Sequence, residues 1–140
     1  MKGFFLLLLL LAPAANCWVI DKCALAQKLK EGGVIGIKNY KLEDYLCLAH
    51  YASGYDTSMH TSRTEYGIFQ INSFWWCTDG KTIGRKNICG MRCSDLLDED
   101  VTDDIRCLNR IVREPKGLES WIPWEVSCKG KDVSSFSDGC

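Results

Sequence analysis

The chain has 140 residues, a length that fits one modest domain. Its formal net charge is −1, so there is no overall basic field to attract nucleic acid or an anionic envelope. No repeat, low-complexity tract or Pro-rich linker indicates a second domain.

The first 17 residues, MKGFFLLLLLLAPAANC, are typical of a secretory signal peptide. Lys2 precedes an apolar run over residues 4–12, and small residues stand at the end of the segment. The run is shorter than the roughly 20 residues that a membrane-spanning helix needs. Cleavage after Cys17 would leave residues 18–140, with 16 basic and 18 acidic residues and a net charge of −2. We therefore expect a secreted, extracellular protein with no membrane insertion.

Two helices are predicted near the start of the mature chain. Asp21 can cap a helix through residues 23–31, CALAQKLKE. The pair Gly32-Gly33 would end it, because glycine readily adopts the left-handed conformation that a helix C-terminus favours. A second helix is expected from Leu42 to about Ser53, where apolar residues recur at helical spacing.

The composition changes from residue 54 to about residue 82. Gly, Ser and Thr separate short aromatic and β-branched runs there, which predicts a small antiparallel sheet. We expect turns at Gly67 and at Asp79-Gly80.

A return to helix is predicted near Val101. Thr102 can cap this helix, and two aspartates in its first turn favour its positive end. The helix would stop before Pro115, and the rest of the chain should form short helical turns held by the last cysteines.

Eight cysteines remain after residue 17, and an even number in a small exported chain indicates a disulfide framework. Spacing alone does not select among the possible pairings. Zinc is the rival interpretation, but no Cys-x-x-Cys pair or His-x-x-x-His run accompanies the cysteines.

The stretch from Asp95 to Cys107 contains five aspartates and one glutamate. The carboxylates of Asp98, Asp103 and Asp104 could converge on calcium, which takes about six to eight oxygen ligands in irregular geometry. The stretch is not an EF-hand loop, since Asp103 stands where that loop needs glycine. From the pattern alone, a solvated acidic face at a helix N-terminus explains the same residues.

Cleavage of a sugar polymer requires two carboxyl groups beside a cleft with aromatic walls. Glu65 precedes a turn in the aromatic-rich segment, and Trp75, Trp76 and Trp121 are candidate faces for sugar rings. The same tryptophans could belong to the core. The helix that ends near Ala52 offers no second acid.

The segments CLAHYASGYDT, TEYGIFQINSFWWCTDGKT and KNICGMRCSDLL, together with the cysteines, resemble the c-type lysozyme and α-lactalbumin family over essentially the whole mature chain. The resemblance implies an α+β fold, with an α lobe of about residues 18–56 and 101–140, a β lobe of about residues 57–100 and a cleft between them. It also implies four disulfides: Cys23 with Cys140, Cys47 with Cys128, Cys77 with Cys93, and Cys89 with Cys107.

The resemblance also assigns residues of the cleft. Lysozymes have a catalytic glutamic acid directly before a serine of the second helix, and here Ala52 stands at that position. The second carboxylate falls on Glu65, where lysozymes usually have aspartate. Positions that line the saccharide subsites in lysozymes correspond to Gln70, Asn72, Trp75, Trp76 and Trp121.

The loss of the acid bears on activity. Alanine cannot protonate a leaving oxygen, and a positioned general acid is worth about 10²–10⁴-fold in rate. We therefore expect binding of β-1,4-linked N-acetylglucosamine-containing glycans with weak or no hydrolysis. The segment over residues 58–63 looks shorter than in typical lysozymes, which would reshape one edge of the cleft.

The acidic stretch resembles the calcium loop of α-lactalbumins and calcium-binding lysozymes. By this resemblance, Asp98, Asp103 and Asp104 supply carboxylates to Ca2+, and Asp95 and Asp100 supply backbone carbonyls. Asp95 replaces a lysine that is frequent in lactalbumins, which leaves a carbonyl ligand possible and adds negative charge.

Two other functions stay open. One is an active lysozyme in which Glu65 and water suffice. The other is an α-lactalbumin-like regulator of a glycosyltransferase, or a cell-recognition protein. Against regulation, the segment over residues 128–140 has lysozyme length, Phe136 matches an aromatic of lysozymes, and His50-Tyr51 departs from the Phe-His pair of lactalbumins. We expect a monomer that does not bind nucleic acid.

Overall fold

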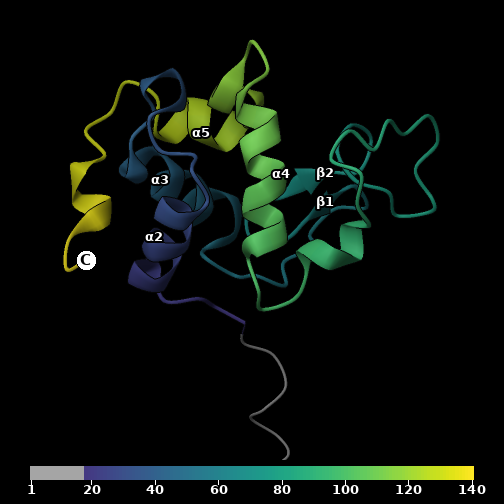
Figure 1. Ribbon diagram of the computed structural model, residues 1–140, viewed down its shortest axis with the longest axis horizontal. Helices are drawn as coiled ribbons and strands as arrows, with labels where there is room; N and C mark the ends of the chain where they lie inside the picture. Colours follow the sequence, from purple (N-terminus) through teal and green to yellow (C-terminus); the bar gives the residue numbers. More distant parts are fainter. Residues whose placement is uncertain (1–17) are drawn as a thin grey trace, which may run out of the picture.

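The computed structural model describes residues 18–140, and the expected signal peptide lies outside the described residues. Helices α2, α3 and α5 gather on one side, the small sheet lies on the other, and α4 runs between them (Figure 1). Within residues 18–140, no helix is long and apolar enough to cross a membrane.

The first two helices lie where the sequence predicts them. Helix α2 spans Lys22–Glu31, and Asp21 caps it by accepting a hydrogen bond from the Ala24 amide at 3.0 Å. Gly33 takes the predicted left-handed conformation with φ 71°, whereas Gly32 stays right-handed with φ −77°. Helix α3 spans Leu42–Ser53 as predicted, and the left-handed Gly54 ends it.

The core includes residues of α2, α3 and α4 together with residues around the sheet and in the turns. Its largest fully buried side chains on these three helices include Leu25, Leu29, Tyr45, Leu46, Leu48, Leu108 and Ile111. The Tyr45 hydroxyl is buried with them and donates a hydrogen bond to the Val34 carbonyl at 2.7 Å, so this buried polar group has a hydrogen-bond partner.

The predicted sheet is present but small. Strands β1, Glu65–Tyr66, and β2, Ile71–Asn72, pair antiparallel with Glu65 opposite Asn72. The predicted turn at Gly67 connects them, and Gly67 adopts φ 81°.

Side-chain hydrogen bonds organise the irregular chain after β2. Asp79 accepts hydrogen bonds from the amides of Lys81 and Thr82 and from the Tyr66 and Thr82 hydroxyls. Desolvation raises the pKa of Asp79, but these four hydrogen bonds outweigh it and hold the pKa well below its ordinary value. The predicted turn at Asp79-Gly80 is therefore fixed by a carboxylate rather than by strand pairing.

Helix α4 spans Thr102–Val112, close to the prediction, but its cap differs from the expected one. Thr102 is the first helical residue, so its side chain does not cap the helix. The Asp100 carboxylate accepts a hydrogen bond from the Thr102 amide at 2.9 Å instead. The rest of the chain forms the expected short turns, with α5 at Ile122–Ser127 and 3-10 turns at Gly117–Ser120 and Ser134–Ser137.

All four disulfides implied by the resemblance are present. Two of them, Cys23–Cys140 and Cys47–Cys128, hold the last part of the chain against α2 and α3. Cys77–Cys93 closes the irregular segment, and Cys89–Cys107 ties that segment to α4. The α+β fold class with four disulfides is confirmed.

Candidate functional site

A pocket of about 210 Å³ lies between the sheet and the helices. It is lined by residues from α3, both strands, α4 and the start of α5. The predicted site residues among them are Ala52, Glu65, Gln70, Asn72, Trp76 and Trp121. The fold therefore brings six residues from distant parts of the sequence to one cavity.

The sheet positions the polar wall of this cleft pocket. Glu65 on β1 and Asn72 on β2 are directly opposite each other in the antiparallel pair, so their side chains are neighbours on the same face of the sheet. The Asn72 side-chain oxygen accepts hydrogen bonds from the amides of Phe74, at 2.6 Å, and Trp75, at 3.4 Å. This bonding fixes the orientation of the Asn72 amide at the pocket wall.

Gln70 has a structural role that the sequence did not reveal. Its side-chain nitrogen donates to the carbonyls of Met59, at 2.9 Å, and Gly67, at 2.8 Å. Its side-chain oxygen accepts from the Thr61 hydroxyl at 2.9 Å. Gln70 thus lines the pocket while it fastens the preceding loop to the hairpin turn.

Two of the three predicted tryptophans line the pocket. Trp121 is 8% exposed, and its indole nitrogen donates to the Phe69 carbonyl at 2.7 Å, which fixes the ring in place. Trp76 is half-buried and lines the pocket from the turn after β2. Trp75 is 47% exposed, packs edge-on against Phe74, and is not among the residues that line this pocket.

Glu65 is the only carboxylate among the described residues that line the pocket. The Ser62 hydroxyl donates to its Oε1 atom at 3.4 Å. Ala52, near the end of α3, contributes only a methyl group to the same cavity. The arrangement can therefore supply one negative charge, but it holds no second carboxyl group to donate a proton.

The pocket also includes residues that no sequence pattern indicated. Thr61 and Ser120 add hydroxyl groups, and Ile122 and Pro123 add apolar surface at the start of α5. These residues lie in turns and at a helix start, where the sequence has no periodicity that could place them.

In the acidic stretch, Asp104 is the residue in the most unusual environment. Its side chain is buried, at 1% exposure, and neither carboxylate oxygen has a hydrogen-bond partner within residues 18–140. Burial raises its pKa well above the ordinary value, and the charges of Asp98 and Asp103 act in the same direction, outweighing the backbone amides of Asp104 and Ile68, which lower the pKa. An unpartnered buried carboxylate needs either a proton or a cation.

The other four aspartates of the stretch have bonds of their own. Asp98 accepts from the Asp100 amide at 3.1 Å, and Asp100 accepts from the Thr102 amide. Asp95 pairs with Arg92 at 3.2 Å, and Asp103 pairs with Arg106 at 3.5 Å. Both ion pairs are at least partly exposed, and such pairs contribute little stability.

As the side chains lie, the described part of the chain has no group of three or more His, Cys, Asp or Glu residues arranged to hold a metal ion. The residues nevertheless fit calcium in two respects. The donors are all oxygens, as calcium prefers, and Asp104 is a buried carboxylate with no cationic side chain within ion-pair distance in residues 18–140. The present bonds of Asp98 and Asp103 each engage only the Oδ1 oxygen of the carboxylate.

A set of helices with a small two-stranded sheet, four disulfides and a cleft walled by tryptophans defines a lysozyme-like α+β protein. The chain belongs to the C-type lysozyme/alpha-lactalbumin family, whose model matches residues 18–140.

Relatives with similar sequences cover nearly the whole chain. It is 44% identical to Lysozyme C-1 of Mus musculus, over 95% of this chain and 93% of that protein. It is also 44% identical to Lysozyme C II of Oncorhynchus mykiss, over 94% of each chain. Sperm acrosome-associated protein 5 of Homo sapiens is 43% identical, over 94% of this chain and 84% of that protein.

Proposed function

We propose that this protein is a secreted, calcium-binding lysozyme-like protein that binds β-1,4-linked N-acetylglucosamine-containing glycans with weak or no hydrolysis. One observation carries the proposal: Ala52 and Glu65 line the same pocket as Trp76 and Trp121. The cavity has the walls of a saccharide cleft but only one carboxylate.

The binding half of the proposal rests on the pocket walls. Indole rings offer flat apolar faces to the C–H groups of a sugar, and Trp121 is already fixed by its hydrogen bond to Phe69. Asn72, Thr61 and Ser120 offer polar groups for hydroxyl and acetamido substituents. A preformed wall of this kind binds at a low entropic cost.

Weak hydrolysis follows from the missing acid. Glycosidic bond cleavage uses one carboxyl group to protonate the leaving oxygen and another to stabilise or attack the sugar. Glu65 could fill the second role, but the methyl group of Ala52 cannot fill the first. The expected loss is about 10²–10⁴-fold in rate.

The calcium part of the proposal is supported by Asp104. The carboxylates of Asp98, Asp103 and Asp104, with the backbone carbonyls of Asp95 and Asp100, would hold the ion. Calcium would compensate the buried charge of Asp104. It would also join the chain over residues 95–100 to the first turn of α4. Its role in this proposal is structural, and the ion takes no part in glycan chemistry.

The deciding experiment is a chitotriose titration by calorimetry, with calcium and with a chelator, alongside a turnover assay on bacterial cell walls. We expect chitotriose binding with turnover far below that of mouse Lysozyme C-1. Turnover equal to that lysozyme would overturn the non-hydrolytic part, and absence of chitotriose binding would overturn the glycan part.

An active lysozyme is the second candidate, and the retained Glu65 and the identity to lysozymes favour it. The turnover assay decides between the two.

A recognition or glycosyltransferase-regulating role is the third candidate. Exposed Tyr51 beside Phe136, with ring centroids 6.4 Å apart, favours a recognition role, whereas the same two residues depart from the lactalbumin pattern and count against regulation. Failure to bind chitotriose, with a changed acceptor preference of an added galactosyltransferase, would support it.

A further inference from the structure

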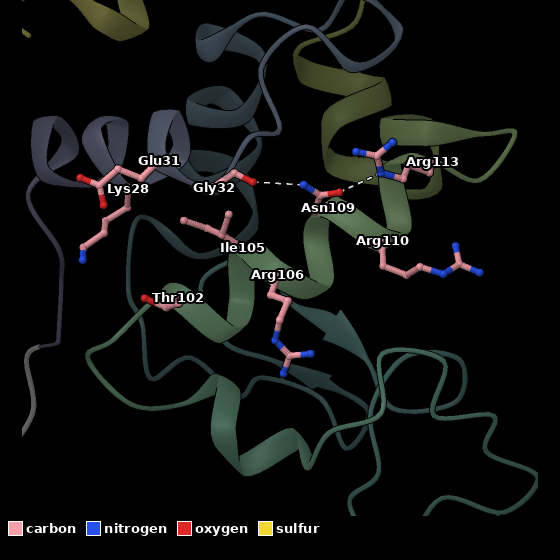
Figure 2. Close-up of a pocket in the computed structure, with 9 residues that line it drawn as sticks. All are labelled: Lys28, Glu31, Gly32, Thr102, Ile105, Arg106, Asn109, Arg110 and Arg113. Carbon is pink, nitrogen blue, oxygen red and sulfur yellow. Dashed lines mark hydrogen bonds between the residues drawn. The ribbon is translucent and has the colours of Figure 1, made fainter.

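A second and larger cavity, of about 420 Å³, lies between α2 and α4 and shares no residue with the cleft pocket. Figure 2 shows α2 on one side, with Lys28 and Glu31, and α4 on the other. Thr102, Ile105 and Asn109, spaced at i, i+3 and i+7 on α4, share one side of that helix. We name this cavity the α2–α4 groove.

Two contacts give the groove a fixed width. Gly32, at the end of α2, has no side chain where Ile105 approaches, and a Cβ atom there would collide with the Ile105 side chain. Asn109 donates a hydrogen bond to the Gly32 carbonyl at 3.1 Å and accepts one from Arg113 at 2.8 Å, as drawn in Figure 2. The two helices and one arginine are thus joined through a single amide side chain.

Cations outnumber acids among the residues that line the groove, although the chain as a whole is not basic. Arg106, Arg110 and Arg113 follow one another at i, i+4 and i+7, which places them along one side of α4. Lys28 adds a fourth positive charge from α2, and Glu31 is the only acid among the lining residues. The Glu31 carboxylate accepts a hydrogen bond from Gln27 at 3.2 Å.

Acids outside the groove compensate only part of this charge. Asp103 pairs with Arg106, and Glu114 pairs with Arg110 at 2.6 Å. Each of these pairs engages one terminal nitrogen of a guanidinium group that carries five N–H donors. Within residues 18–140, Lys28 and Arg113 have no carboxylate within ion-pair distance.

We propose that the α2–α4 groove binds a polysaccharide that carries sulfate or carboxylate groups. The three arginines extend over about 10 Å of helix, from the rise of roughly 1.5 Å per residue, which suits several anionic groups spaced along a chain better than one compact anion. Guanidinium groups match sulfate and carboxylate oxygens with paired N–H donors.

The groove does not suit nucleic acid. Proteins that hold single strands use aromatic rings on which bases stack, and none of the residues lining the groove is aromatic. The net charge of −1 gives no long-range attraction for any polyanion, the proposed polysaccharide included, so binding must depend on contacts inside the groove.

The test is titration of the full mature protein with a heparin-derived hexasaccharide at physiological salt. A double variant, Lys28→Gln with Arg113→Gln, removes the two groove cations that have no acidic partner. Arg85→Gln with Lys86→Gln is the matched control: it removes one arginine and one lysine from exposed positions outside the groove. We expect the groove variant to lose about tenfold or more in affinity and the control to change less than about threefold.

Three results would overturn the proposal: no binding by the unsubstituted protein, equal losses in the two double variants, or equal competition by single-stranded DNA of the same charge. Thermal unfolding of both variants shows whether each is folded, so that a loss of affinity is not caused by misfolding. Amide shift mapping gives an independent readout, because hexasaccharide shifts should fall on α2 and α4. Shifts confined to the cleft pocket, or displacement by chitotriose, would assign the binding to the cleft instead.

Discussion

Gly67 and Asp104 meet where the hairpin turn packs against the start of α4: a Cβ atom on residue 67 would lie 2.6 Å from Asp104 Oδ2. Gly67 also has φ 81°, a conformation that side chains rarely adopt. The turn of the hairpin and the buried carboxylate therefore occupy adjoining space, and each limits what residue the other position accepts.

Gly67→Ala should destabilise the protein through both strain and collision. Gly130 provides the control, since it has φ 72° and a Cβ atom added there would meet nothing within 4 Å. We expect Gly130→Ala to cost about 1–2 kcal/mol from the left-handed conformation alone. Gly67→Ala should cost about 1–3 kcal/mol more, because the packed surroundings must move. Urea unfolding measures both, and equal costs would show that the close packing of Gly67 against the Leu96 carbonyl and Asp104 is unimportant.

Asp104→Asn should have opposite effects with and without calcium. In a chelator at neutral pH, the substitution removes a buried carboxyl group that must either take up a proton or stay charged without a cation, so the free energy of unfolding should rise. With calcium in excess, the unsubstituted protein gains RT ln(1 + [L]/Kd), about 2.7 kcal/mol at a hundredfold excess, and the variant should gain much less. Thermal unfolding in both buffers checks the crossover. A melting temperature that calcium and chelator leave unchanged in the unsubstituted protein would remove the calcium site.

The same residue predicts a pH dependence. The pKa of Asp104 is higher in the folded protein than in the unfolded chain, so the folded state keeps its proton to higher pH. In chelator, the free energy of unfolding should therefore fall as pH rises from the ordinary aspartate pKa through the raised one. Asp104→Asn should remove this fall, and denaturant unfolding across pH 3.5 to 7, a range set from roughly the ordinary carboxyl pKa upward, compares the two proteins.

Ala52→Glu should restore a proton donor beside Glu65. If Glu65 can act as the second carboxylate, turnover of bacterial cell walls should increase by about 10²–10⁴-fold. Ala52→Gln is the matched control, because it has nearly the same size without an acid. An equal response to both substitutions would show that the new side chain acts by shape, and no increase with Glu would show that Glu65 is not competent.

Trp76→Ala and Trp75→Ala should weaken chitotriose binding to different extents. Trp76 lines the cleft pocket, so its loss should weaken chitotriose binding by about tenfold or more, as for other aromatic anchors. Trp75 lies outside this pocket and is largely exposed, so its loss should have a smaller effect. Calorimetric titration of both variants tests the order. A larger loss for Trp75→Ala would mean that the bound glycan extends beyond the pocket.

Local sequence patterns predicted the helices well and the sheet only in outline. The limits of α3 follow from apolar spacing and a terminal glycine, both of which are local properties. The strands are only two residues long, and side-chain hydrogen bonds to Asp79 organise the chain that follows them. The expected cap at Thr102 was wrong, since a carboxylate two residues earlier reaches the same amide.

The candidate site was predicted residue by residue through resemblance, but its physical character was not. Nothing in the sequence distinguished Asp104 from the other aspartates, because its burial depends on the distant Gly67 turn. Gln70 was predicted as a cleft residue, but its bonds to the preceding loop depend on how the chain folds back on itself. The α2–α4 groove was not predicted. The net charge of the chain sums its cations with the neighbouring acidic residues, so it does not reveal where the cations gather.

The disulfide between Cys23 and Cys140 closes a covalent ring of chain, and the other three bridges lie inside that ring. Hydrolysis of any one peptide bond between these two cysteines therefore leaves a single molecule. In the acidic stretch the protection is doubled, because Cys89–Cys107 also spans it. A protease can nick this protein without dividing it, and the fragments separate only after reduction.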